Sequence, residues 1–225
     1  MRIPHMLLTA LILFFATSGY ALPQEDKLPA LIRNISVTVL LDQILIYEKG
    51  RGELESEIRK IFENASSVFE KEFSITFSID ALTPWQAPYD TNESLDPHVV
   101  ISETAKTGKK NKSDITIAIL QAYMSIPVEY EIETLDGRKF IIENAEWYSG
   151  YANAEKNVAA IVLHERSSVS LIHEIAHIFY AGHTESHSIM NESLIITDEP
   201  LDFDEENRQI ILENRLRSFD KSLIP

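Results

Sequence analysis

The stretch from His173 to His183 constrains this chain more than any other, because it sets three histidines and a glutamate in a metal-binding pattern. It begins H-E-x-x-H, and side chains four residues apart lie on one face of a helix. His173 and His177 can therefore direct two imidazoles at one Zn²⁺, with Glu174 beside them to take a proton from water. We expect a positive φ at Gly182 to end the helix, so that His183 supplies a third ligand. Three histidine ligands leave the fourth tetrahedral position open, which is typical of a catalytic zinc.

The alternative is a buried helix that carries two histidines by coincidence. Most residues around them are apolar, namely Val169, Leu171, Ile172, Ile175, Ala176, Ile178 and Phe179. A helix that is apolar nearly all round is buried, and burying a carboxylate and two imidazoles without a partner is costly. A metal supplies that partner, so the sequence favours the metal site. His187 is an alternative third ligand, whereas His98 and His164 are predicted to be surface residues.

These residues resemble the metzincin clan of zinc metallopeptidases, whose pattern is H-E-x-x-H-x-x-G-x-x-H followed by a tight turn with a methionine below the zinc. The three histidines and the glutamate match in identity and spacing, and Met190 stands where a short Met-turn would fall. The short gap between His183 and Met190 is similar to that of the matrixin and archaemetzincin branches. Tyr180 occupies the position of the clan's glycine. Either the helix ends later than in the clan, or Tyr180 adopts a strained conformation.

The resemblance implies a metzincin-like α/β (α+β) fold: a twisted mixed sheet of about five strands, a backing helix, a central active-site helix and a C-terminal helix. It implies a zinc-dependent endopeptidase with one catalytic Zn²⁺ and Glu174 as general base. Gly150, Tyr151 and Ala152 would form an edge strand that binds an extended protein or peptide substrate through main-chain hydrogen bonds, with an ordinary loop as the alternative. If Tyr180 blocks the open metal position, the alternative function is a secreted zinc-binding protein that does not hydrolyse peptides.

Hydrophobic periodicity predicts the remaining elements. We expect strands at 34–47, 73–81, 114–120, 149–153 and 157–163, helices at 52–72 and 202–219, a long loop at 82–112 and an inserted hairpin at about 127–144. The strand–helix–strand order at the start implies a parallel pair. Four apolar residues of the last helix are expected to face inward: Phe203, Ile210, Ile211 and Leu216.

Residues 1–21 resemble a secretory signal peptide, with Arg2 ahead of an apolar run at 6–16 that is short for a bilayer span. An uncleaved anchor is the alternative. We expect residues 22–225 to form one catalytic domain that is secreted, or periplasmic in a bacterium, monomeric, and without stable membrane association after signal removal. The chain has no cysteine, so disulfides are excluded.

The formal net charge of −15 argues against nucleic-acid binding. It is compatible with Ca²⁺ as a second ion. Asp90, Asn92, Ser94 and Asp96 alternate as in a calcium loop, but the central glycine and closing glutamate of an EF-hand are missing. We therefore predict an ordinary polar loop there.

Overall fold

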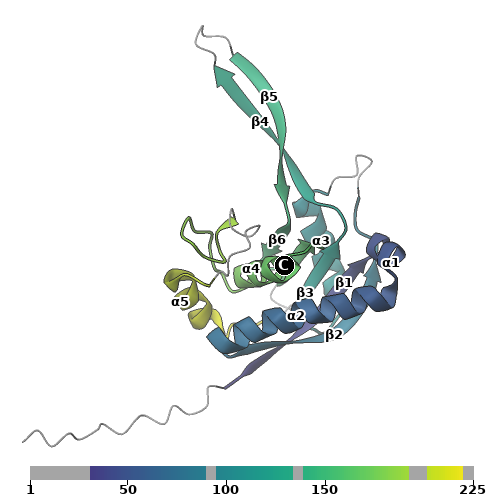
Figure 1. The fold of residues 1–225 in the computed structure, drawn as a ribbon, viewed down its shortest axis with the longest axis vertical. Helices are drawn as coiled ribbons and strands as arrows, with labels where there is room; N and C mark the ends of the chain where they lie inside the picture. The colour runs from purple at the N-terminus through teal and green to yellow at the C-terminus, as the bar shows by residue number, and fades with distance from the viewer. Residues whose placement is uncertain (1–30, 90–94, 134–138, 193–201, 220–225) are drawn as a thin grey trace, which may run out of the picture. The chain divides into compact units, whose positions relative to one another are not determined.

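A five-stranded sheet forms the middle layer of the fold, in the order β2-β1-β3-β7-β6 (Figure 1). The computed structural model describes residues 31–89, 95–133, 139–192 and 202–219. The strands of the sheet are β1 (Arg33–Asp42), β2 (Ile75–Trp85), β3 (Ile115–Leu120), β6 (Gly150–Asn153) and β7 (Val158–Val162). The first pair is parallel, as are the β1–β3 and β3–β7 pairs, whereas β6 runs antiparallel to β7 at the sheet edge. The predicted mixed sheet of about five strands is confirmed.

Helices cover both faces of this sheet. The helices are α1 (Gln43–Lys49), α2 (Arg51–Phe73), α3 (Pro97–Gly108), α4 (Ser167–Ile178) and α5 (Glu205–Asn214). Val37 and Val39 of β1 pack with α2 and α4 in one core, whereas Leu40, pointing to the opposite face, packs with α3 in another. All six residues of β3 are buried, as expected for a strand covered on both faces. The helix α4, which carries the predicted metal ligands His173 and His177, packs against α2, against the edge strand β6 and against its neighbour β7.

Two predicted elements are wrong because the helix-capping residues Asp42 and Asp96 begin helices that were not predicted. The first strand ends at Asp42, whose side chain accepts a hydrogen bond from Ile44 N at 3.1 Å and begins α1 where strand was predicted up to residue 47. The predicted loop at 82–112 contains the end of β2 and the helix α3. Asp96 caps α3 by accepting from His98 N at 2.7 Å, and Pro97 occupies its first turn.

The C-terminal helix is shorter than the predicted 202–219. Phe203 and Ile211 are buried as expected, but Leu216 lies beyond the end of α5 with 66% of its surface exposed. The predicted signal peptide at 1–21 and residues 90–94 of the candidate calcium stretch lie outside the described residues. In the described part of the chain, no helix has the length and apolar character needed to cross a membrane.

The inserted hairpin is confirmed and is longer than predicted. It consists of β4 (Met124–Glu133) and β5 (Lys139–Tyr148), which pair antiparallel along their whole length as a separate two-stranded sheet (Figure 1). The end of β5 leads within two residues into the edge strand β6. The hairpin therefore brings its last residues to the same sheet edge that was predicted to bind substrate.

An aromatic cluster centred on Phe69 connects α2 to the active-site helix. The ring of Phe69 lies between 5.2 and 6.0 Å, centroid to centroid, from the rings of Phe73, Phe77, Phe179 and Phe203. Phe179 follows α4 directly, and Phe203 lies just before α5. This packing fixes the position of the end of α4, from which the predicted metal ligands project.

Replacing Phe69 by alanine is expected to lower the free energy of unfolding by about 3–5 kcal/mol, because it leaves a cavity among four aromatic rings. The control is Val99→Ala, at an α3 position that is 44% exposed, with a change within about 0.5 kcal/mol. Urea denaturation measures both. A Phe69→Ala protein as stable as the control would show that the cluster does not hold α4 in place.

Candidate active site

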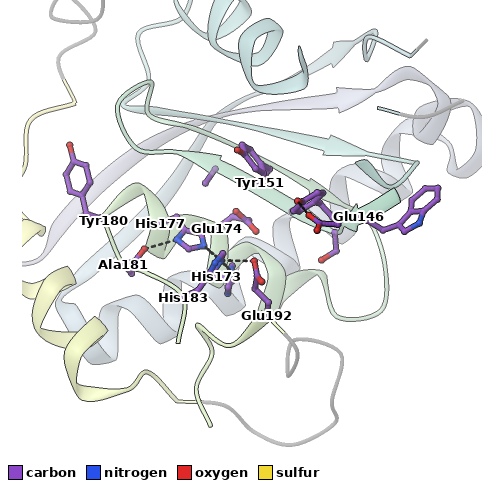
Figure 2. A pocket seen from close by; sticks show the side chains of 14 residues that line it. Glu146, Tyr151, His173, Glu174, His177, Tyr180, Ala181, His183 and Glu192 are labelled. Atoms are coloured by element: carbon purple, nitrogen blue, oxygen red, sulfur yellow. Dashed lines mark hydrogen bonds and ion pairs between the residues drawn. The ribbon is translucent and has the colours of Figure 1, made fainter. Parts of the chain in front are cut away.

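The imidazoles of His173, His177 and His183 converge on one point (Figure 2). The Nε2 atoms of His173 and His177 are 3.0 Å apart, and that of His183 lies 2.9 Å from His177 and 3.2 Å from His173. The first two residues share a face of α4 because they are four positions apart. Of the two candidate third ligands, the group contains His183 and not His187.

Backbone carbonyls set the orientation of the two rings on α4. His173 Nδ1 donates to Ile189 O at 2.8 Å, and His177 Nδ1 donates to Ala181 O at 2.7 Å. Each bond places the ring proton on Nδ1, so the Nε2 lone pairs face one another. Burial, followed by the neighbouring His177, lowers the pKa of His173 to about 3, and burial lowers the pKa of His177 to about 4. Both rings are therefore neutral at physiological pH.

This arrangement fits a zinc ion. The Nε2 atoms of His173 and His177 carry no proton and repel one another at 3.0 Å, and a cation between them removes that repulsion. Zn–N bonds of about 2.0–2.1 Å at a tetrahedral angle hold their nitrogens about 3.3–3.4 Å apart, close to the observed separations. Two of the three imidazoles, those of His173 and His177, are held by carbonyl partners on Nδ1, which is typical of zinc-binding histidines. The three histidines are consistent with a zinc site of the metzincin type.

The turn after α4 is made by Tyr180 and not by Gly182. Tyr180 has a φ of +69°, in the left-handed region, whereas Gly182 does not have a positive φ. The prediction for Gly182 was wrong, and the strained alternative for Tyr180 is what the structure has. The Gly182 amide instead donates to Asn207 Oδ1 of α5 at 2.8 Å. This bond holds the backbone immediately before His183.

Arg217 lies against Tyr180 at this strained turn. Its guanidinium carbon is 4.6 Å from the Tyr180 ring centroid, and the same side chain donates to the carbonyls of Ile178 and Ala154. A cation over an aromatic face is attractive, and a donor to the Ile178 carbonyl satisfies a free acceptor at the end of α4. Figure 2 shows the Tyr180 ring pointing away from the three histidines. The Tyr180 ring, which could have blocked the open metal position, therefore points away from it.

The predicted Met-turn is tied to the start of α5. Met190 is fully buried in the same core as α4. The Ser188 hydroxyl donates to Asp204 Oδ2 at 2.7 Å and accepts from Met190 N at 3.1 Å. Ile189, between them, supplies the carbonyl that orients His173. The turn thus determines the direction of one predicted ligand, which gives Met190 a packing role next to it.

Glu174 is buried against the edge strand. It is only 5% exposed, and burial, followed by the charge of Glu192, raises the pKa of its carboxyl well above the usual value. A Cβ built on Gly150 would lie 2.3 Å from Glu174 Oε1, so only glycine fits there. The missing side chain lets the β6 backbone approach the carboxylate closely. The predicted base and the predicted substrate strand are therefore neighbours.

A cleft of about 760 Å³ runs along this junction. Gly150, Tyr151 and Ala152 line it together with the three histidines and Glu174. Of the two histidines predicted to be surface residues, His98 is exposed and its ring lies 5.4 Å from that of Tyr151, whereas His164 is half-buried with its Nε2 3.0 Å from the Ser170 hydroxyl.

The cleft also contains two acidic residues: Glu192, in the segment after Met190 that the clan resemblance implies as a pocket wall, and Glu146, which sequence reasoning missed. The Glu192 carboxylate lies 3.1 Å from His183 Nε2, and Glu146 accepts a hydrogen bond from the Tyr148 hydroxyl at 2.8 Å. For each residue, its position in the sequence indicated a place near the site. Glu192 stands two residues after Met190, and Glu146 stands four residues before Gly150 at the end of the hairpin. Residues so close to predicted site positions were candidates for the cleft wall.

Removing His183 is expected to lower the affinity for zinc by more than about 100-fold, since even loss of a hydrogen bond to a ligand costs about 10–100-fold. The matched control is His187→Ala, which removes the other candidate ligand and is expected to leave zinc affinity unchanged. Competition with a chromogenic chelator measures both. The opposite ranking of the two variants would assign the third ligand to His187.

Tyr180→Gly is expected to be more stable than Tyr180→Ala by about 1 kcal/mol, because only glycine adopts a φ of +69° without strain. Both variants lose the ring that contacts Arg217, so their difference isolates the backbone strain. Thermal and urea unfolding of the two proteins measure it. An alanine variant equal to or more stable than the glycine variant would show that the turn is not strained.

Comparison with known proteins was made for sequence and for structure. No protein-family model and no curated protein matches the sequence. Among solved structures, an archaemetzincin from Methanopyrus kandleri is 15% identical to this chain, with a TM-score of 0.57. The match covers 84% of this chain and 99% of the archaemetzincin chain. A chain from a structure described as a chaperone–substrate complex is 11% identical, with a TM-score of 0.55. The match covers 81% of this chain but only 34% of that chain. A zinc-dependent peptidase from Methanocorpusculum labreanum is 15% identical with a TM-score of 0.49, covering 78% of this chain and 99% of its own. The chain has an archaemetzincin-like fold, and it carries a three-histidine cluster consistent with the metzincin zinc site.

Proposed function

We propose that the protein is a secreted zinc-dependent endopeptidase, with His173, His177 and His183 as metal ligands and Glu174 as general base. One observation carries the proposal. A buried carboxylate lies beside three converging imidazoles, at a cleft whose wall is the edge strand of a sheet. A structural metal site needs neither a neighbouring carboxylate nor an open cleft.

Zn²⁺ held by the three Nε2 atoms would supply a Lewis acid for the scissile carbonyl and lower the pKa of water to about 7. Glu174 would take the proton from the attacking water and pass it to the leaving amine. Its buried position suits this task, because a carboxylate with a raised pKa accepts a proton more readily. Gly150 supports the same step by leaving room for the carboxylate.

The edge strand β6 would hold the substrate backbone. It pairs with β7 on one side, and Gly150, Tyr151 and Ala152 line the cleft. An extended peptide that adds to this edge gains main-chain hydrogen bonds whatever its sequence. Protein or peptide substrates suit such a site, and the closeness of Gly150 to Glu174 would place a peptide bond near the base.

The second candidate is a secreted zinc-binding protein that does not hydrolyse peptides. Tyr180 was the feature that favoured this candidate. The Tyr180 ring lies against Arg217 and points away from the histidines (Figure 2). Secretion is proposed from the signal-like sequence at 1–21. A zinc-loaded protein that binds unfolded chains and cleaves none of them would favour this second candidate.

Glu174→Gln is expected to lower the rate of casein hydrolysis by about 10²–10⁴-fold, because it removes the general base and keeps the shape of the side chain. Zinc content should stay at one ion per chain. Glu165→Gln, at an exposed position just before α4, is the matched control and should keep wild-type activity. Undiminished casein hydrolysis by the zinc-loaded Glu174→Gln protein would contradict the assigned role.

A further inference from the structure

The charged side chains that line the cleft are all acidic. They are Glu146, Glu174 and Glu192, and among the described residues that line the cleft there is no lysine or arginine. The Arg217 guanidinium lies against the Tyr180 ring and donates to the backbone carbonyls of Ile178 and Ala154. The described lining of the cleft therefore contains three carboxylates and neither lysine nor arginine.

Glu192 and Glu146 reach the cleft from two different elements. Glu192 follows the Met-turn, keeps 61% of its side chain exposed, and lies 3.1 Å from His183 Nε2. Glu146 comes from the end of β5 and is bonded to the Tyr148 hydroxyl. The hydrogen bond to Glu146, burial, and the charges of Glu146 and Glu192 raise the pKa of Tyr148 to about 12. Both carboxylates line the cleft, and both act on Tyr148, which lines it with them.

Glu174 adds a third carboxylate that has no hydrogen-bond donor. It is 5% exposed and faces the cleft (Figure 2), and within the described part of the chain no group donates to it. A buried carboxylate without a donor is costly, so Glu174 is suited to the water whose proton it would take, and a peptide cation is left to Glu192 and Glu146. The net charge of −15 adds a long-range attraction for cations.

Aromatic side chains lie beside the acidic residues. Trp147 is 66% exposed, and the rings of Tyr148 and Tyr151 lie 6.0 Å apart, edge to face. Lysine and arginine side chains combine a long apolar stem with a cationic head, so they match carboxylates flanked by rings. The Glu192 side chain is 61% exposed, so its carboxylate can be reached by a cationic side chain of a bound peptide.

From this combination we infer that the cleft selects peptides that carry a lysine or arginine within two residues of the scissile bond. The cationic head pairs with Glu192 and Glu146, and its stem lies on the neighbouring rings. The inference rests on the proposed function, since it names the substrate class of the same cleft.

The first experiment identifies cleavage sites in a diverse peptide library digested by the zinc-loaded protein, using mass spectrometry. Lysine and arginine should be enriched about three- to tenfold within two residues of the cut, the range of an exposed ion pair plus a cation–π contact. Glu192→Gln and Glu146→Gln should each reduce the enrichment, and Glu192→Lys should replace it with a preference for acidic residues. Glu165→Gln is the control and should leave the enrichment of lysine and arginine unchanged. Equal cleavage of basic and acidic sequences, or enrichment that survives both glutamine substitutions, would overturn the inference.

A binding measurement separates this inference from the proposed function. The zinc-loaded Glu174→Gln protein is titrated with two fluorescent peptides that differ only in carrying lysine or glutamate. Tighter binding of the lysine peptide that weakens with added salt supports the inference even if no peptide is cleaved. Equal binding of the two peptides overturns it, even if the wild-type protein hydrolyses casein.

Discussion

The site depends on the electrostatics of three imidazole nitrogens held within 3.2 Å of one another. Two of them lack a proton because their rings donate from the opposite nitrogen to backbone carbonyls. Without a cation these nitrogens repel one another. A bound cation removes this repulsion, and its binding energy stabilises the folded state. The Phe69 cluster and the sheet hold α4 firmly enough to maintain this arrangement.

The C-terminal segment holds the remaining parts of the site. Asp204 binds the Ser188 hydroxyl of the Met-turn, Asn207 binds the Gly182 amide before the third histidine, and Arg217 binds the end of α4. These contacts join residues far apart in the sequence. The short loop between His183 and Met190 therefore needs no disulfide to keep its shape, in agreement with a chain that has no cysteine.

Local patterns predicted the parts of the molecule that local interactions determine. The i, i+4 spacing placed His173 and His177 on one helix face, and short apolar runs located the buried strands β3 and β7. The helix α3 was missed because Pro, Asp and Lys around it suggested a loop, although Asp96 and Pro97 form a helix start. The strained turn at Tyr180 was offered as one of two alternatives, and its partner Arg217 comes from the distant C-terminal segment. The acidic residues Glu146 and Glu192 also come to one cleft only through tertiary structure.

X-ray absorption at the zinc edge of the loaded protein tests the central claim most directly. The account predicts one zinc per chain with three imidazole nitrogens at about 2.0–2.1 Å and one further oxygen ligand. A zinc with two or fewer imidazoles, or a protein that does not retain zinc after gel filtration, would contradict it.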